Sequence, residues 1–404
     1  MILKYSNDGK VLENSIVNNY SFNLTDRDYY LDEFGNKILR FVGFVTNDND
    51  DIFVSFPKHF EVNEVINDTN IIFNLIMSHR QKKPELYIGE TNKNKFKTNY
   101  PFAAFYAIYD YYLKYGLVIE NEVQIKSNTT GKINWKHTLK NTNSYIIEEA
   151  LIFFPFYYEK KTWFVDILAE CMTFAINYTN SKFSVLLNVE YVDLEINYYY
   201  YLNFKDKIIQ VLLEIRQNVY KDHLIFLVEN LLAFFKQLKI GGVYYIKHYS
   251  FSNIWEDMVN RYLELNYNDM NEGIIDFQKG ISKFKFKSLA LHPNLEKPDQ
   301  FIKPDHLYVG DKGKLIFDAK YYNELKGINY KQISYYLFLK EWKLMSEEEK
   351  IYSALILPNA SNFSKIHFKM DPEFNDTYKD LIIYEIYLDI KNVINCYLNN
   401  DYYV

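Results

Sequence analysis

The stretch from residue 303 to residue 320, KPDHLYVGDKGKLIFDAK, decides the fold of this chain. The runs 306–309 and 314–317 flank Gly-Asp-Lys-Gly, a sequence typical of a tight β-hairpin turn. Alternate residues of a strand point to the same face, so Asp318 and Lys320 are predicted to share one. We therefore expect a hairpin that brings Asp305 near this pair.

Burying two carboxylates and an ammonium group on one face of a sheet costs desolvation free energy, so this arrangement is expected only where a function uses it. A Mg²⁺ site facing a phosphodiester is such a use, because Mg²⁺ prefers oxygen ligands and keeps several waters. Asp305 and Asp318 are the predicted metal ligands, with the carbonyl group of Ala319 as a further one. Lys320 is predicted to lie near the attacking water or the scissile phosphate, where it would stabilise developing charge.

A helix is predicted on each side of this hairpin. In the upstream helix, Glu256 would reach the site as an additional metal ligand or as a holder of metal-bound water. In the downstream helix, Gln332 and Tyr336 lie one turn apart and would orient Lys320 or a phosphate. Residues 351–357 are predicted to form a buried strand. Residues 283–287 alternate lysine with phenylalanine, which predicts the first strand of the same sheet.

The order helix, strand, strand, strand, helix, strand resembles the core of the PD-(D/E)XK nuclease superfamily. The combination of Trp-Glu at 255–256, Pro-Asp at 304–305, Asp-Ala-Lys-Tyr-Tyr at 318–322 and Lys-Gln-x-x-x-Tyr at 331–336 resembles the LlaJI-type restriction endonucleases and their relative McrC. Weaker similarities are Phe-Val-Gly-Phe at 41–44, Phe-Pro-Lys at 56–58 and Gly-Lys-Ile-Asn-Trp at 131–135.

This resemblance implies an α/β fold, with an α+β mixed sheet in a restriction-endonuclease-like core at the carboxy terminus and an α+β domain before it. It implies a Mg²⁺-dependent DNA endonuclease, with Mn²⁺ as a substitute, from a prokaryotic restriction system used in antiviral defence. The implied partners are double-stranded DNA and a separately encoded AAA+ GTPase similar to McrB. A homodimer on DNA is a further assembly that the resemblance allows.

The 404 residues suffice for two domains of ordinary size. Lys-Ile-Gly-Gly at 239–242 is the best boundary, which predicts a domain at 1–240 and a nuclease domain at 245–404. The first domain would recognise DNA, dock a partner, or do both.

The net charge of −6 is untypical of a general nucleic-acid binder, so DNA contacts are expected from local basic segments. Plain solvated surface is the competing interpretation of each segment. The predicted DNA-binding residues are Lys93, Lys95, Lys132, Trp135, Lys136 and Tyr336.

Cys171 and Cys396 are far apart in apolar patterns, which favours a reducing compartment over a disulfide framework or a zinc site. The amino terminus lacks the apolar run of a signal peptide, and no uncharged run approaches the roughly 20 residues that span a bilayer. A cytoplasmic location without membrane association is expected. No P-loop sequence is present, so nucleotide hydrolysis would belong to the partner.

Two other functions stay open. A lone Asp-x-Lys sequence usually reflects only a turn residue and charges on a surface hairpin. The ordered set of elements around it is what favours a nuclease site here. The chain could be another nuclease of the same fold, acting at transposon ends or in repair. It could also be a non-catalytic assembly subunit that retains the nuclease fold, although intact Asp305, Asp318 and Lys320 argue against this.

Overall fold

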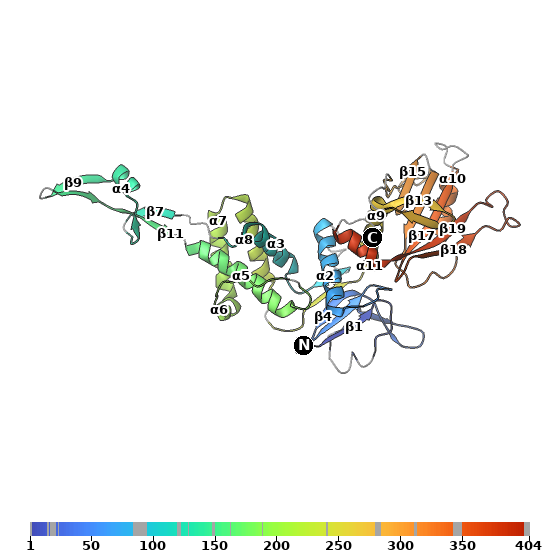
Figure 1. Cartoon of the computed structure of the whole chain (residues 1–404), viewed down its shortest axis with the longest axis horizontal. Coiled ribbons are helices and arrows are strands. Elements are labelled where there is room, and N and C mark those ends of the chain that lie inside the picture. Colours follow the sequence, from blue (N-terminus) through green and yellow to red (C-terminus); the bar gives the residue numbers. More distant parts are fainter. Residues whose placement is uncertain are drawn as a thin grey trace. The chain divides into compact units, whose positions relative to one another are not determined.

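The structure is a computed structural model that describes residues 2–13, 16, 22, 24–83, 95–118, 123–127, 129–147, 150–161, 163–187, 189–239, 241–278, 284–310, 313–341 and 350–399. The chain forms two compact units (Figure 1). The first unit combines residues 1–99 with 241–404, and the second comprises 100–240. Each unit mixes helices with β-structure.

The amino-terminal part of the first unit is built on a five-stranded sheet. Its order is β1 (Leu3–Asn7), β5 (Ile52–Phe56), β4 (Val42–Thr46), β12 (Tyr245–His248) and β6 (Phe96–Thr98). Strands β1 and β5 run parallel, whereas the other neighbours are antiparallel. Gly43 has a φ of 142°, and a Cβ atom there would collide with the carbonyl oxygen of Ile246. Glycine at this position therefore allows β12 to approach β4.

Strand β12 explains why the units differ from the predicted division at residue 240. The strand follows Gly242 in the chain, yet it pairs between two strands from the first 99 residues. Helix α2 (Val65–Lys82) also packs against α11 (Ile390–Asn399), and Lys391 Nζ donates to Asp68 Oδ1 at 3.0 Å. The chain re-enters the first unit near the predicted boundary, so residues 1–99 fold with the carboxy-terminal segment.

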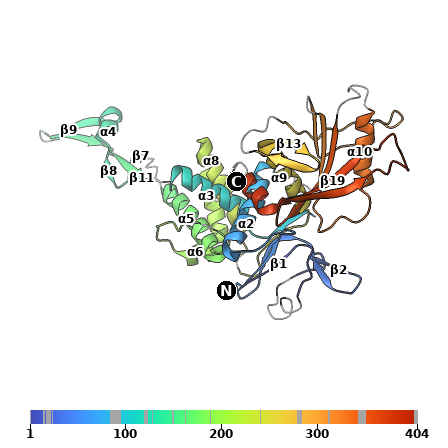
Figure 2. The same cartoon turned by 45° about the vertical axis from the view of Figure 1, so that its right-hand side comes forward.

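The second sheet of the first unit carries the predicted hairpin (Figure 2). Its order is β15 (His306–Gly310), β16 (Gly313–Ala319), β17 (Ile351–Asn359), β19 (Ile382–Asp389) and β18 (Phe363–Lys369). The β15–β16 and β18–β19 pairs are antiparallel, whereas β16, β17 and β19 are parallel. Helices α9 (Phe251–Asn266) and α10 (Tyr330–Lys340) pack against this mixed sheet. The predicted hairpin, its two helices and the strand at 351–357 are confirmed.

The segment at 283–287, predicted to be the first strand of this sheet, forms no continuous strand among its described residues. Lys283 lies outside the described residues, and the remainder makes one isolated bridge, from Lys287 to Leu307. Phe284 and Phe286 are nevertheless buried, while Lys285 and Lys287 are exposed. The alternation therefore predicted the two faces of this segment without predicting its pairing. A separate hairpin, β13 (Tyr267–Asn271) and β14 (Ile274–Phe277), precedes it.

The second unit contains a group of helices and two small β-structures. The helices are α3 (Phe102–Tyr115), α5 (Trp163–Phe183), α6 (Tyr198–Asn203), α7 (Lys205–Asn218) and α8 (Asp222–Gln237). Helix α8 packs against α3, α5 and α7. The strands are β7 (Val123–Ser127), β11 (Tyr157–Lys161) and β8 (Lys132–Ile133) in one sheet, and β9 (Asn143–Ile147) with β10 (Ala150–Phe154) in another. Helix α4 (Trp135–Asn141) follows β8. Among the described residues, no helix combines the length and apolarity needed to cross a bilayer.

Candidate active site

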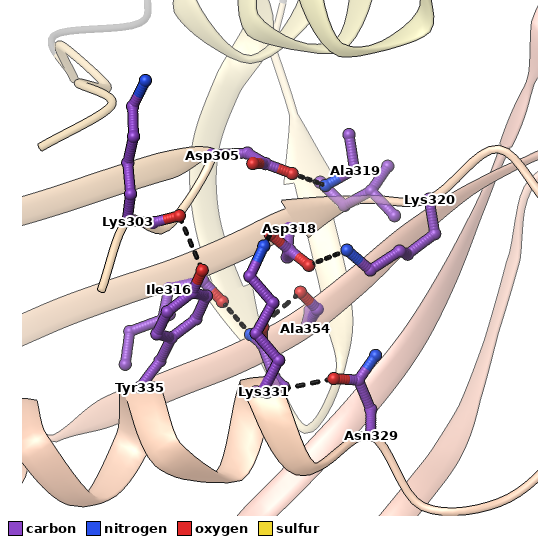
Figure 3. Close-up of polar contacts among 12 residues, drawn as sticks. Lys303, Asp305, Ile316, Asp318, Ala319, Lys320, Asn329, Lys331, Tyr335 and Ala354 are labelled. Carbon is purple, nitrogen blue, oxygen red and sulfur yellow. Dashed lines mark hydrogen bonds and ion pairs between the residues drawn. The ribbon is translucent and has the colours of Figure 1, made fainter. Parts of the chain in front are cut away.

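The end of β16 and the residue before β15 bring two carboxyl groups together (Figure 3). Asp305 Oδ2 accepts a hydrogen bond from the backbone N–H of Ala319 at 3.0 Å, which joins the two ends of the hairpin. Burial, followed by the hydrogen bond and charge repulsion with Asp318, raises the pKa of Asp305 to about 8. The two carboxyl groups therefore share a proton at neutral pH.

Asp318 has no exposed surface, so its charge needs close compensation. Its carboxylate forms an ion pair with Lys320 and lies 3.6 Å from the Nζ atom of Lys331. Burial alone would raise the pKa of Asp318, but the hydrogen bond from Asp305 and the charge of Lys320 outweigh burial and lower it. Asp318 is consequently the ionised member of the carboxyl pair.

Lys331 is a site residue that the sequence analysis did not assign. It stands one position before Gln332, in the Lys-Gln-x-x-x-Tyr motif, of which only the glutamine and the tyrosine are predicted site residues. Burial lowers the pKa of Lys331, but the hydrogen bond with Tyr335 and the charge of Asp318 outweigh burial and raise it. Lys331 therefore stays charged and faces the same carboxylate as Lys320.

Glu256 reaches the site from helix α9. The neighbouring Trp255 is fully buried and donates its indole N–H to the carbonyl oxygen of Ile356 at 3.3 Å, which anchors the helix to β17. Burial, then repulsion from Asp257 and Asp318, raises the pKa of Glu256. Asp257 instead pairs with the buried His79 at 2.8 Å. Adjacent acidic residues on one helix thus face different environments.

Gln332 holds strands together, and its placement differs from the predicted contact with Lys320 or a phosphate. Its side chain is fully buried, and its Nε2 atom donates to the carbonyl oxygen of Ile316 at 2.8 Å and to Ser353 Oγ at 3.0 Å. These acceptors belong to β16 and β17, which makes Gln332 a bridge two residues before Asp318. It positions the strand that carries the site and does not line the pocket there.

Tyr336 lies in the apolar core, with only 3% of its surface exposed. It packs in a cluster with Leu355, Leu357 and Ile383, beneath the parallel strands. This burial is incompatible with the predicted DNA contact. The reason is helical geometry, because the turn that places Gln332 against the sheet also turns Tyr336 towards it.

The predicted basic segments are distributed over both units. Lys132, Trp135 and Lys136 are exposed in the second unit, around the start of α4. Lys95 is exposed in the first unit, next to β6. Lys93 lies outside the described residues. The second-unit segments are therefore accessible to DNA, and they belong to a different unit from the carboxyl pair.

Asp305 lines a pocket of about 480 Å³, and Asp318 is buried behind it. Its charged and polar lining includes Asp8, Arg40, Lys58, Glu256, Asp305, Lys320, Tyr321 and Lys331, together with Ala319. The described partners of the Asp318 carboxylate are Lys320, Lys331 and Asp305, and its two oxygens have about four acceptor positions, so acceptor capacity is left for a cation. No three His, Cys, Asp or Glu side chains converge on a metal position in the described part of the chain. Asp305 and Asp318 alone fit Mg²⁺, which is usually bound by one or two carboxylates and several waters.

A family model described as LlaJI restriction endonuclease matches residues 41–399. The chain belongs to this family. The match includes the carboxyl pair, both flanking helices and the whole second unit, so this family member is a nuclease of a restriction system. No curated protein matches the chain.

Proposed function

We propose that this LlaJI-family chain is a Mg²⁺-dependent DNA endonuclease of the PD-(D/E)XK type, related to McrC. The observation that supports this most is the Asp305–Asp318 pair beside Lys320. Burial, together with the hydrogen bond to Asp318 and its charge, raises the pKa of Asp305, so Asp305 is the member of the pair that retains its proton. A divalent cation would replace that proton and satisfy both groups.

The residues that would hold the cation are Asp305 and Asp318, with the Ala319 carbonyl group as a further donor and Glu256 as a holder of metal-bound water. Mg²⁺ is the expected cation and Mn²⁺ its substitute, since both prefer oxygen ligands. When bound, the cation supplies charge neutralisation at the phosphate and a more acidic water. The raised pKa of Glu256 suits a group that holds a proton close to the reacting water.

Lys320 is the group that would act on the transition state. Its side chain is 14% exposed and its ammonium is held by Asp318, so it is preorganised at the pocket. Negative charge increases on the phosphate oxygens during hydrolysis, and a fixed ammonium group stabilises that charge without reorganisation. Lys331 supplies a second positive charge from α10, with its Nζ atom 3.6 Å from Asp318 and its side chain 54% exposed.

The proposal includes a separately encoded AAA+ GTPase partner, similar to McrB, and double-stranded DNA as substrate. Support for a protein partner comes from the β9–β10 hairpin of the second unit. Ile146 pairs directly with Leu151 across this hairpin, and their side chains are 79% and 58% exposed. An exposed apolar pair on a hairpin is typical of a docking surface.

The decisive experiment replaces Asp318 with asparagine in the full chain, assayed on plasmid DNA with Mg²⁺ and the partner protein. Asp318→Asn keeps the side-chain volume and removes one ligand charge, so cleavage should be abolished while thermal stability is retained. Asp376→Asn, at a carboxylate in an exposed ion pair, is the matched control and should cleave normally. Equal cleavage by both variants would refute the assigned site, and lack of cleavage by the wild type would favour the non-catalytic subunit.

A further inference from the structure

The pocket of the carboxyl pair has a wall that the catalytic assignment does not use. Asp8, Arg40 and Lys58 line it, and all three come from the first 60 residues. They follow strands β1, β3 (Lys37–Leu39) and β5 respectively. Lys58 belongs to the Phe-Pro-Lys segment at 56–58. The segments that follow β3 and β5, which belong to different sheets, therefore contribute two cationic side chains to the same pocket as the proposed nuclease centre.

Direct hydrogen bonds connect this wall of the pocket to the segment that follows strand β16. The backbone N–H of Lys58 donates to the hydroxyl group of Tyr321 at 2.8 Å, and Tyr321 directly follows Lys320. Asn323 Nδ2 donates to the carbonyl oxygen of Gly9 at 3.1 Å. Gly9 has a φ of 83°, and a Cβ atom at this position would collide with the Asn323 side chain. The close approach of the two segments thus requires glycine.

The side chains of Lys58 and Arg40 make no ion pair within the described residues. Asp8 is their acidic neighbour. Burial raises the pKa of its carboxyl group and outweighs the charge of Lys58, the hydrogen bond with Tyr321 and the charge of Arg40, which lower it. The Lys58 ammonium lies 5.2 Å from the centre of the Tyr321 ring. By contrast, the buried Lys247 of strand β12 forms an ion pair with Asp28 at 2.6 Å.

Arg40 and Lys58 are two cations beside one buried carboxyl group, and neither forms an ion pair within the described residues, so they are arranged to receive an anion from outside the chain. The anion that the proposed function brings to this pocket is the DNA backbone. We propose that Lys58 and Arg40 bind a backbone phosphate next to the one that is cut. This subsite rests on the proposed function and extends it, because the predicted DNA contacts were placed elsewhere.

Binding of a short DNA duplex by the full chain tests the subsite, with Ca²⁺ in place of Mg²⁺ to prevent cleavage. Affinity is measured from about 50 to about 200 mM salt, because each phosphate contact contributes about 0.9 to the slope of log affinity against log salt. The double variant Lys58→Ala with Arg40→Ala should bind more weakly, with a slope shallower by about two units. Lys58→Arg should retain the slope of the wild type, since it keeps the charge.

Lys379→Ala is the matched control, because Lys379 is exposed in the same unit and lies outside the pocket. The alanine substitution keeps the Lys58 backbone N–H that bonds Tyr321, so the wall is expected to stay in place. A double variant with the control's affinity and slope would overturn the subsite, as would weaker binding at an unchanged slope. Cleavage by Asp318→Asn would instead overturn the proposed function. A wild type that does not bind the duplex would overturn both.

Discussion

One site in each unit departs from the usual rule of burial, and the two sites depart in opposite directions. In the first unit, Asp318 is charged and has no exposed surface. In the second, Ile146 is apolar and 79% exposed. Soluble proteins avoid both arrangements, because a buried charge loses hydration and an exposed apolar patch promotes association. Each arrangement is expected to persist only where an activity needs it.

Under the proposed function, the difference corresponds to a division of labour between chemistry and docking. Around Asp318, ammonium groups and a second carboxyl group set the charge of a pocket. At Ile146, the pairing with Leu151 presents apolar surface on a hairpin. Electrostatic preorganisation serves a reaction, whereas apolar area serves association. Changes in the two places should therefore affect different measurements.

The largest expected effect is on the chemical step. Lys320→Ala removes a preorganised charge and should lower the cleavage rate at saturating DNA by about 10²–10³, as does the loss of one fixed electrostatic group elsewhere. Single-turnover cleavage measures this rate. Lys326→Ala, an exposed lysine of the same unit, is the control. A rate within about threefold of the wild type would show that Lys320 does not stabilise the transition state.

On the docking side, Ile146→Asp should leave folding intact because the side chain is exposed. It should weaken binding of the proposed AAA+ GTPase partner by at least about tenfold, the effect expected of a buried interface residue. Titration of the labelled partner measures this affinity. Tyr220→Asp changes an 84% exposed aromatic residue of the same unit and should bind normally. Equal binding by both variants would show that the hairpin is not the docking surface.

The carboxy-terminal fold was largely predictable because its signals are local. The turn at 310–313 and the Asp-x-Lys spacing predict the hairpin, and the structure confirms it. The insertion of β12 beside β4 could not be predicted, because nothing in its four residues specifies a partner some 200 positions earlier. Likewise, helical periodicity predicted that Gln332 and Tyr336 share a face, but it could not show that this face meets the sheet.

A smaller effect is expected from the basic residues of the second unit. Lys132→Ala with Lys136→Ala should reduce DNA affinity and flatten its salt dependence by up to about two units, if both side chains contact phosphates. The same duplex titration that tests Lys58 and Arg40 measures it. Comparison of the two double variants assigns phosphate contacts to each unit. A wild-type slope in the Lys132 and Lys136 variant would confine DNA binding to other residues.

The smallest expected effect concerns the stability of the carboxyl pair itself. In the unfolded chain the Asp305 carboxyl group has its ordinary pKa of 3.8, whereas in the folded chain burial and Asp318 raise the pKa to about 8. Between these values the folded chain holds one proton more than the unfolded chain, so the free energy of unfolding falls as the pH rises.

Asp305→Asn removes this pH-dependent contribution to the free energy of unfolding, and the asparagine oxygen can still accept the hydrogen bond from the Ala319 N–H. Without metal at about pH 8, the variant should therefore be more stable than the wild type by at least about 1 kcal/mol, or some 2–4 °C in Tm. The difference should shrink as the pH is lowered towards 4. Mg²⁺ should then stabilise the wild type more than the variant, because only the wild type presents two carboxylates to the cation. Thermal denaturation with and without Mg²⁺ measures both effects, and identical pH profiles for the two proteins would contradict the shared proton.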